Sequence, residues 1–429
     1  MALLLKNADV YLNKLFQRVD ILVTGDKLFV FDKSANCNEP CNEPIEKVID
    51  LKNKFILPGF ADVHVHFREP GFSYKGTIKT GCLAAAKGGY THVCTMPNLN
   101  PPPSTLENLQ KQLDIIKKDA CINVTPYGTI TMKQDGQSTL SKMEELAPYV
   151  CAFSDDGRGV QTKLLMEDAM KAAKSLGKLI VAHCEDETLL GGNAIHDGKL
   201  AKLMGIKGIS SESEWKQVER DVELAAKTGC GYHVCHVSTK ETIEIIRQAK
   251  KSDIDVTCET APHYLLMSDM DLEDLGRFKM NPPIRDASDK EALREGLYDG
   301  TIDMIATDHA PHSEAEKSKG LLKSAFGIVG LETAFPLLYT NLVKKDKLIP
   351  FEKLVEVMAE NPRKRFRLPG GEIKNGGIPQ LSVWDLDADY EIDSKKFSSL
   401  GKATPFEHWK VFGKLQMTIS NGEIVYAES

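Results

Sequence analysis

The hydrophobic pattern differs between the two ends of the chain and its middle. At both ends, short runs of alternating apolar and polar residues are separated by turns, as in "ALLLKNADVYL" and "LSVWDLDADYEI". Runs of this length and composition predict β-strands. We therefore expect residues 1–57 and 366–429 to pair as the two parts of one small β-domain.

In the middle, over residues 58–365, short apolar runs recur and a helix-like segment follows each. The eight runs are "GFADVHVHF", "YTHVCTMPN", "INVTPYGTI", "CAFSDD", "LIVAHCED", "YHVCHVS", "DVTCETAPHY" and "DMIATDHAPH". Strands that alternate with helices predict a parallel sheet with helical crossovers, and eight repeats over about 250 residues fit a (β/α)8, TIM-like barrel. An open doubly wound sheet is the alternative, but no Gly-x-Gly-x-x-Gly follows the first strand. The predicted fold class is α/β, a barrel with a small β-sandwich domain built from both chain ends.

Composition and charge exclude several classes of protein. The chain has 429 residues, of which 42% are hydrophobic and 27% charged, as in an ordinary globular protein. A net charge of -7 with no block of Lys or Arg argues against a nucleic-acid partner. No stretch approaches the roughly 20 apolar residues of a membrane span, and the N-terminus lacks the features of a signal peptide. We expect a cytoplasmic protein whose cysteines are buried thiols in a reducing compartment.

Polar residues recur where the predicted strands of the middle region end. His64 and His66 are two residues apart, so both side chains lie on one face of the first strand and can chelate a metal. His183, His236 and Asp308 end three other strands. In a barrel, the C-terminal strand ends meet at one face, where the chemistry takes place. Imidazole and carboxylate ligands together suit zinc or a similar first-row ion.

Four histidines and one aspartate are too many for a single catalytic ion with an open position, but they suit two ions that share an anionic bridge. The fourth strand ends in "FSDDG", so the bridge is Asp155 or Asp156, and side-chain alternation does not choose between them. Two ions would lower the pKa of a shared water toward neutrality. Asp308 could accept the proton as the resulting hydroxide attacks, and return it in the reverse direction.

Segments across the predicted barrel together resemble the dihydroorotases of the amidohydrolase superfamily. They are, in chain order, "DVHVHFREPG", "TMPNLNP", "DDG", "VAHCE", "CHVST", "KMNPPIR", "MIATDHAPH" and "AFGIVGLETA". An aspartate where many related barrels carry a bridging lysine is similar to the bacterial type I branch. The resemblance implies reversible cyclisation of N-carbamoyl-L-aspartate to L-dihydroorotate in de novo pyrimidine (UMP) biosynthesis. It also implies a metal-bound hydroxide as nucleophile and an aspartate as general acid/base.

The resemblance assigns a role to each matching residue. The implied metal ligands, for two zinc ions per subunit, are His64, His66 and Asp308 for the first ion, His183 and His236 for the second, and Asp156 as the bridge. The family's spacing before the "AHC" histidine is what selects Asp156 over Asp155. Asp308 is also the implied general acid/base. The implied substrate contacts are His66, Arg68, Asn98, Asn281, His312, Phe326 and Gly327, with Arg68, Asn98 and His312 holding the substrate carboxylate.

Two rival functions follow from the same residues. A sister cyclic amidohydrolase, such as a dihydropyrimidinase, hydantoinase or allantoinase, would share the barrel and ligands, but Arg68 together with Asp156 favours dihydroorotase. An inactive scaffold homologue that serves aspartate transcarbamoylase would have lost ligands that are all present here. We expect a small-molecule substrate and no nucleic-acid or membrane partner. The sequence leaves open a homodimer and an association with aspartate transcarbamoylase.

Other polar positions favour structural roles. We expect His233 to face away from the site and Arg285 to be a loop charge. The segment "HSEAEKSKG" is either a mobile loop near the site or a plain solvated loop, and no role is assigned to Asp62. The tandem copy "CNEPCNEP", from Cys37 to Pro44, predicts an exposed turn between two strands.

Overall fold

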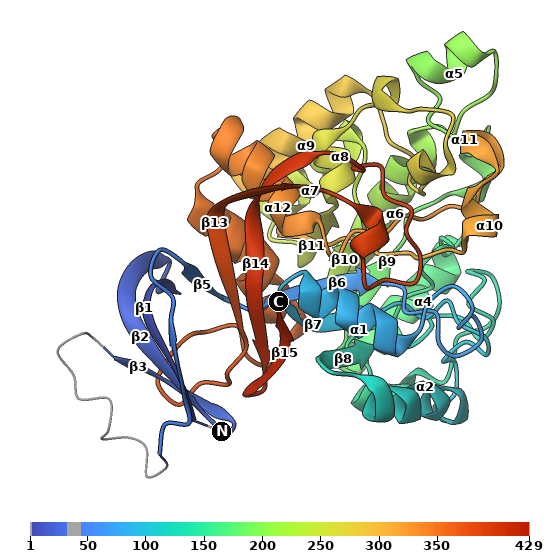
Figure 1. Ribbon diagram of the computed structural model, residues 1–429. Coiled ribbons are helices and arrows are strands. Elements are labelled where there is room, and N and C mark those ends of the chain that lie inside the picture. Colours follow the sequence, from blue (N-terminus) through green and yellow to red (C-terminus); the bar gives the residue numbers. More distant parts are fainter. Residues whose placement is uncertain (1, 32–43, 429) are drawn as a thin grey trace.

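The computed structural model describes residues 2–31 and 44–428 (Figure 1). The turn predicted at "CNEPCNEP" lies, apart from Pro44, outside the described residues. The strands are β1 (Ala2–Leu12), β2 (Leu15–Thr24), β3 (Lys27–Phe31), β4 (Lys47–Asp50), β5 (Phe55–Pro58), β6 (Phe60–Val65), β7 (Tyr90–Thr95), β8 (Asn123–Pro126), β9 (Ile180–Ala182), β10 (Tyr232–Val234), β11 (Val256–Thr260), β12 (Met304–Ile305), β13 (Leu381–Glu391), β14 (Lys410–Ser420) and β15 (Glu423–Ala427).

The helices lie mainly between β6 and β13. The α-helices are α1 (Ile78–Lys87), α2 (Leu106–Asp119), α3 (Met143–Leu146), α4 (Lys163–Ser175), α5 (Lys199–Met204), α6 (Glu212–Thr228), α7 (Lys240–Lys251), α8 (Pro262–Leu266), α9 (Ala287–Asp299), α10 (Glu314–Lys317), α11 (Gly320–Lys323), α12 (Ala334–Leu338), α13 (Phe351–Val355) and α14 (Asn361–Phe366). Short 3-10 segments are Ala147–Tyr149, Glu187–Leu189, Asp269–Asp271, Gly276–Phe278 and Ser394–Lys396, and π-helical turns are Tyr339–Lys345 and Glu356–Glu360. In the described part of the chain, no helix is both long and apolar enough to cross a membrane.

Strands from the two chain ends form one sheet, as the sequence pattern predicts. Its order is β15-β14-β13-β5-β1-β2-β3, and β4 pairs with β1. The junction is the antiparallel pair β5 and β13, in which Ile56 lies opposite Val383. Figure 1 shows the blue N-terminal strands beside the red C-terminal strands, away from most of the helices.

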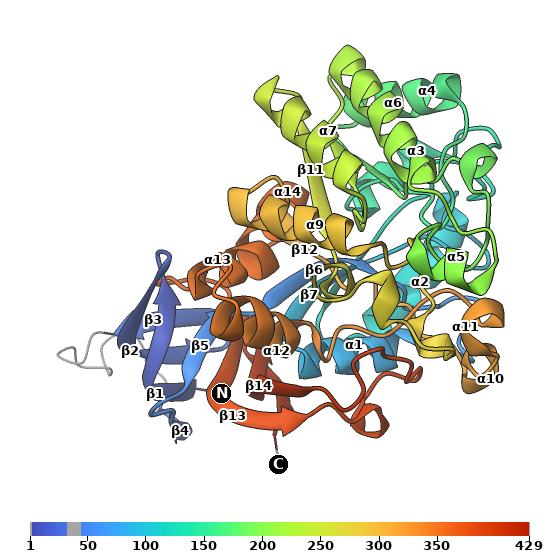
Figure 2. The same ribbon diagram turned by 90° about the horizontal axis from the view of Figure 1, so that it is seen from above.

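The middle of the chain contains parallel strands in two sheets, with orders β6-β7-β8 and β9-β10-β11-β12. Seven of the eight predicted runs contain these strands. The eighth, "CAFSDD", is not a regular strand, because Phe153 forms only single parallel bridges, to Gly128 and to Ile180. Helices α6, α7 and α9 pack side by side outside the strands (Figure 2).

A threonine caps the N-terminus of four crossover helices. The hydroxyl oxygens of these threonines accept a hydrogen bond from the backbone amide three residues later, at Thr77 for α1, Thr105 for α2, Thr162 for α4 and Thr239 for α7. Such a cap satisfies one of the amides that a helix N-terminus leaves without a partner. In these four crossovers the chain therefore passes through a loop into a helix that starts at a fixed residue, and the loops carry polar residues of the site.

Candidate active site

A cavity of about 220 Å³ lies where the C-terminal ends of the parallel strands meet. It is lined by His66, Arg68, Asn98, Asp156, Gly157, His183, His236, Asn281, Asp308, Ala310, His312, Phe326 and Gly327. The structure thus gathers the residues that the sequence singled out around one cavity. His64, which is fully buried, lies next to it rather than in its lining.

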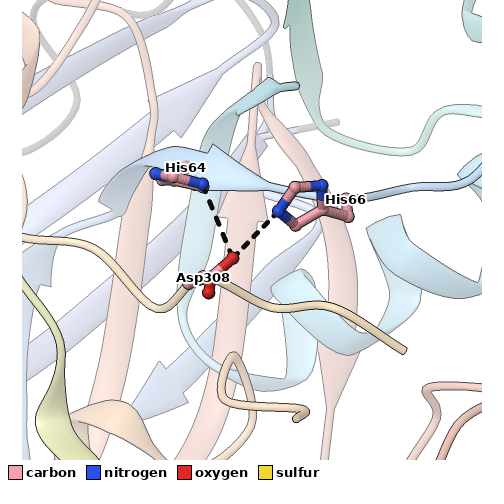
Figure 3. A group of neighbouring side chains, drawn as sticks. All are labelled: His64, His66 and Asp308. Atoms are coloured by element: carbon pink, nitrogen blue, oxygen red, sulfur yellow. Dashed lines mark hydrogen bonds and ion pairs between the residues drawn. The ribbon is translucent and has the colours of Figure 1, made fainter. Parts of the chain in front are cut away.

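Strand β6 and the segment after β12 build one side of the cavity. Oδ1 of Asp308 is 2.9 Å from Nε2 of His66 and 3.5 Å from Nε2 of His64 (Figure 3). Asp308 has a positive φ of 47°, in the left-handed region that non-glycine residues rarely adopt. This backbone turn and the shared strand face bring two imidazoles and one carboxylate together.

The two aspartates after Phe153 take different roles. Oδ1 of Asp156 is 3.2 Å from Nε2 of His64, 3.6 Å from Nδ1 of His183 and 3.6 Å from Nε2 of His236. The carboxylate of Asp155 instead accepts hydrogen bonds from backbone amides of the loop after β8, at Ile130, Thr131 and Gly136. Asp156 therefore faces the histidines, and Asp155 holds the loop.

Opposing effects set the charge of the two acids in the cavity. Burial on its own would raise the pKa of Asp308, but the neighbouring histidines, His66 first, lower it to about 2. Burial likewise opposes ionisation of Asp156, and His64, His183 and His236 nevertheless hold its pKa well below the usual range. Both carboxylates are anions near neutral pH, which is the form that binds metal.

The donor set fits divalent metal ions. Two groups, His64 with His66 and Asp308, and His64 with Asp156 and His236, each place their ligand atoms within 4.8 Å of one another. Among the described residues, Nε2 of His64 and Oδ1 of Asp156 are buried without any hydrogen-bond partner. Buried polar atoms rarely lack a partner in native proteins. A cation between these atoms would satisfy both.

Two buried carboxylates behind the site are absent from the sequence-based prediction. Glu259 on β11 lies 2.7 Å from Nδ1 of His64 and 3.2 Å from Nε2 of His233. Asp62 accepts hydrogen bonds from the His64 amide and from the amide and hydroxyl of Thr307. These contacts orient His64 and tie β6 to the residue that precedes Asp308. An acid inside an apolar strand is the only sequence signal for either.

Another part of the cavity lining is cationic. Arg68 is buried, its Nε donates to the backbone oxygen of Pro311 at 3.2 Å, and its Nη2 lies 3.3 Å from Nε2 of His312. Within the described chain, no carboxylate forms an ion pair with this guanidinium. Asn98 also lines the cavity, and its Oδ1 contacts Nδ1 of His66 at 2.9 Å. A buried arginine without an acidic partner suits an anionic ligand.

Two later loops, around Asn281 and around Phe326, form another wall of the cavity. Asn281 donates through Nδ2 to the Glu185 carboxylate at 2.8 Å. Gly327 has φ of +129°, and an added Cβ would lie 2.8 Å from the backbone oxygen of Ala310 and 3.0 Å from His312. Only glycine fits this position, so the backbone of Phe326 and Gly327 packs directly against the segment that carries His312.

The structure places two other predicted positions. Arg285 is not a loop charge, so that prediction is wrong: it is buried and donates to Ser238 and to the backbone oxygen of Ile209. Arg285 is buried because the segment around Ile209 and Ser210 folds over its guanidinium and accepts hydrogen bonds from it. His233 faces away from the cavity, as expected, and contacts Thr257 at 2.8 Å.

Comparisons with known proteins agree with this arrangement. The family described as "Dihydro-orotase-like" matches residues 53–242. The dihydroorotase of Fusobacterium nucleatum is 49% identical over 427 residues, which are 99% of either chain. The dihydroorotase of Anoxybacillus flavithermus is 48% identical over 410 residues, which are 95% of this chain and 94% of that one.

Solved structures share the fold. The L-hydantoinase (dihydropyrimidinase) from Arthrobacter aurescens aligns with a TM-score of 0.87 and 27% identity, covering 100% of this chain and 96% of that one. The dihydropyrimidinase from Brevibacillus agri aligns with a TM-score of 0.85 at 21% identity, covering 100% and 95%. The fold is thus shared with these enzymes, while sequence identity near one half over the whole chain is found with the dihydroorotases. The chain belongs to the dihydroorotase family.

Proposed function

We propose that this protein is a dihydroorotase, which interconverts N-carbamoyl-L-aspartate and L-dihydroorotate. The observation that carries the proposal is a single small cavity with two chemistries. It brings Asp308, among the histidines, together with a buried arginine that has no acidic partner in the described chain. The substrate carries both matching groups, a cyclic amide to be opened and a carboxylate to be held.

Two divalent metal ions, with zinc as the expected identity, would be held by this chain's own residues. His64, His66 and Asp308 would bind one ion, His183 and His236 the other, and Asp156 lies between the two sets. When bound, the ions supply Lewis acidity toward the carbonyl and lower the pKa of a water. Asp156 stands where many related barrels carry a bridging lysine, which supports placing this protein in the type I branch of the family.

Asp308 is the group that moves the proton. As water adds to the ring carbonyl, the Asp308 carboxylate accepts a proton from it. Asp308 then gives that proton to the ring nitrogen as the carbon–nitrogen bond breaks. Cyclisation runs the same transfers backward. The low pKa of Asp308 keeps its carboxylate ionised before the attack, and the contact with His66 fixes the orientation of that carboxylate.

His312 and Arg68 lie together in the cavity, and the Arg68 guanidinium fits a carboxylate. Burial, with Arg68 and Lys75 nearby, lowers the pKa of His312 to about 3, so its ring is neutral. A guanidinium can only donate, so Nε2 of His312, 3.3 Å from Nη2 of Arg68, accepts from it and holds the guanidinium in place. The other donors of the Arg68 guanidinium can then bind a substrate carboxylate, which can accept two parallel hydrogen bonds from it.

Hydantoinase activity is the second candidate, because the solved neighbours carry that name. Rings such as dihydrouracil lack a carboxylate and would leave the Arg68–His312 pair unused. We therefore expect the protein to turn over dihydroorotate much faster than dihydrouracil or allantoin. Preference for dihydrouracil would overturn the proposal.

We also propose that the parallel strands form a (β/α)8 barrel over residues 58–365. Support comes from the isolated parallel bridges Gly128–Phe153 and Phe153–Ile180, which link the two sheets, and from Val65–His309, which links their other edges. For a small β-sandwich domain from residues 1–57 and 366–429, support comes from one apolar cluster. That cluster contains Leu3, Ile21, Leu381 and Met417.

A cytoplasmic location stays a prediction, and a homodimer and an association with aspartate transcarbamoylase stay open.

A further inference from the structure

Lys317 is a buried lysine at the end of α10, in the charged segment that follows His312. Its ammonium donates to three backbone oxygens, those of Lys279 at 2.9 Å, Ala325 at 2.7 Å and Gly327 at 2.7 Å. An ammonium has three donors and no acceptor, so these contacts use its full capacity. Among the described residues, its side chain forms no ion pair, which is unusual for a buried lysine.

The three oxygens belong to two segments that form one wall of the cavity. One segment runs from Lys279 to Asn281, and the other from Ala325 to Gly327. The segments are also joined directly, because the amide of Gly327 donates to the Lys279 oxygen at 3.0 Å. The Lys279 ammonium lies 4.5 Å from the centre of the Phe326 ring and donates to the backbone oxygen of Leu322. Lys317 is the charged group at which both segments meet.

We propose that Lys317 is a positioning residue that fixes this wall against the substrate ring. The inference rests on the proposed function for its substrate, but the local structure carries it. Gly327 packs so closely on Ala310 and His312 that the wall has no room to shift inward. If the ammonium is lost, three buried oxygens lose a donor, and the wall can relax only outward, away from the ring. The charged segment is thus an anchored part of the site rather than a plain solvated loop.

The test compares Lys317→Met with Lys317→Arg and with the control Lys323→Met, which changes an exposed lysine at the end of the next helix, α11. The methionine is an unbranched side chain one atom shorter than lysine, and it removes the donors. We expect KM for dihydroorotate to rise about tenfold in Lys317→Met, with a smaller change in kcat, because an unmade buried hydrogen bond costs on the order of one tenfold step. We expect partial recovery in Lys317→Arg and wild-type values in Lys323→Met.

Hydrogen exchange of the Gly327 amide gives a readout that does not depend on turnover. We expect faster exchange in Lys317→Met than in wild type or Lys323→Met. A wild-type KM together with wild-type exchange in Lys317→Met would overturn the inference. If Lys317→Met does not fold, unchanged KM and exchange in Lys317→Gln overturn it equally. Absence of dihydroorotate turnover in the wild type would instead reject the proposed function, while the exchange comparison would still decide whether Lys317 holds the wall.

Discussion

The carboxylate of Glu259 on β11 lies 2.7 Å from Nδ1 of His64 on β6. An ionised carboxylate only accepts, so Nδ1 of His64 carries a proton and Nε2 is left with a free lone pair. That lone pair points to the side where Asp156 lies, at 3.2 Å. A carboxylate behind the ring of a metal-binding histidine fixes its tautomer and orientation. Glu259 therefore holds His64 in the tautomer and orientation in which its Nε2 can bind a metal ion.

Replacing Glu259 with glutamine tests this relationship. We expect Glu259→Gln to bind zinc about 10-fold to 100-fold more weakly, the usual effect of removing such a partner. Competition with a chromophoric chelator measures the affinity. Glu295→Gln on α9, an exposed change in the same region of the chain, serves as the control. Equal zinc affinity in the two variants would contradict the role given to Glu259.

Substituting Asp156 should affect metal binding, whereas substituting its neighbour Asp155 should affect stability. Asp156→Asn should reduce the metal content of the purified protein, because Asp156 faces the histidines. Asp155→Asn should instead lower the thermal unfolding midpoint, because its amide group cannot accept from all the backbone amides that the carboxylate holds. Metal analysis and a thermal melt on both variants check this. The reverse pattern would mean that the wrong neighbour had been assigned to the metals.

Asp308 should be required in both directions of the reaction. We expect Asp308→Ala to lower kcat for hydrolysis and for cyclisation by about 10²- to 10⁴-fold, the range typical of a lost general acid/base. Activity is measured with dihydroorotate and with N-carbamoyl-L-aspartate as starting materials. Near-normal turnover in either direction would refute the proton-transfer role.

Arg68 should act mainly on substrate binding. Arg68→Met removes the guanidinium that would hold the substrate carboxylate, and we expect KM for dihydroorotate to rise about 30-fold, corresponding to about 2 kcal/mol. The matched control is Arg158→Met, which removes an exposed arginine that pairs with Glu187 on the surface. An unchanged KM in Arg68→Met would show that this arginine does not hold the carboxylate.

Much of the site could be predicted because each ligand ends an apolar run. His183 and Asp308 are examples, and the structure brings both to the same cavity. The choice between Asp155 and Asp156 could not be made from alternation. Their run forms only isolated bridges at Phe153, so its side chains do not alternate as those of a regular strand do.

Contacts between distant segments explain what the sequence could not predict. Glu259 meets His64 across 195 positions of the chain. Arg285 and Lys317 look like solvated charges in the sequence, yet both are buried, because backbone oxygens of other segments surround them. Hydrophobic periodicity records which face of an element is buried, but it does not record which polar groups lie opposite.

The most direct test is a titration of metal-free protein with zinc while dihydroorotate turnover is measured. The account predicts no turnover without metal and a rise that reaches its plateau near two zinc ions per chain, as the two sets of ligands around Asp156 require. Absence of dihydroorotate turnover at every zinc loading, in protein that binds the metal, would contradict the account.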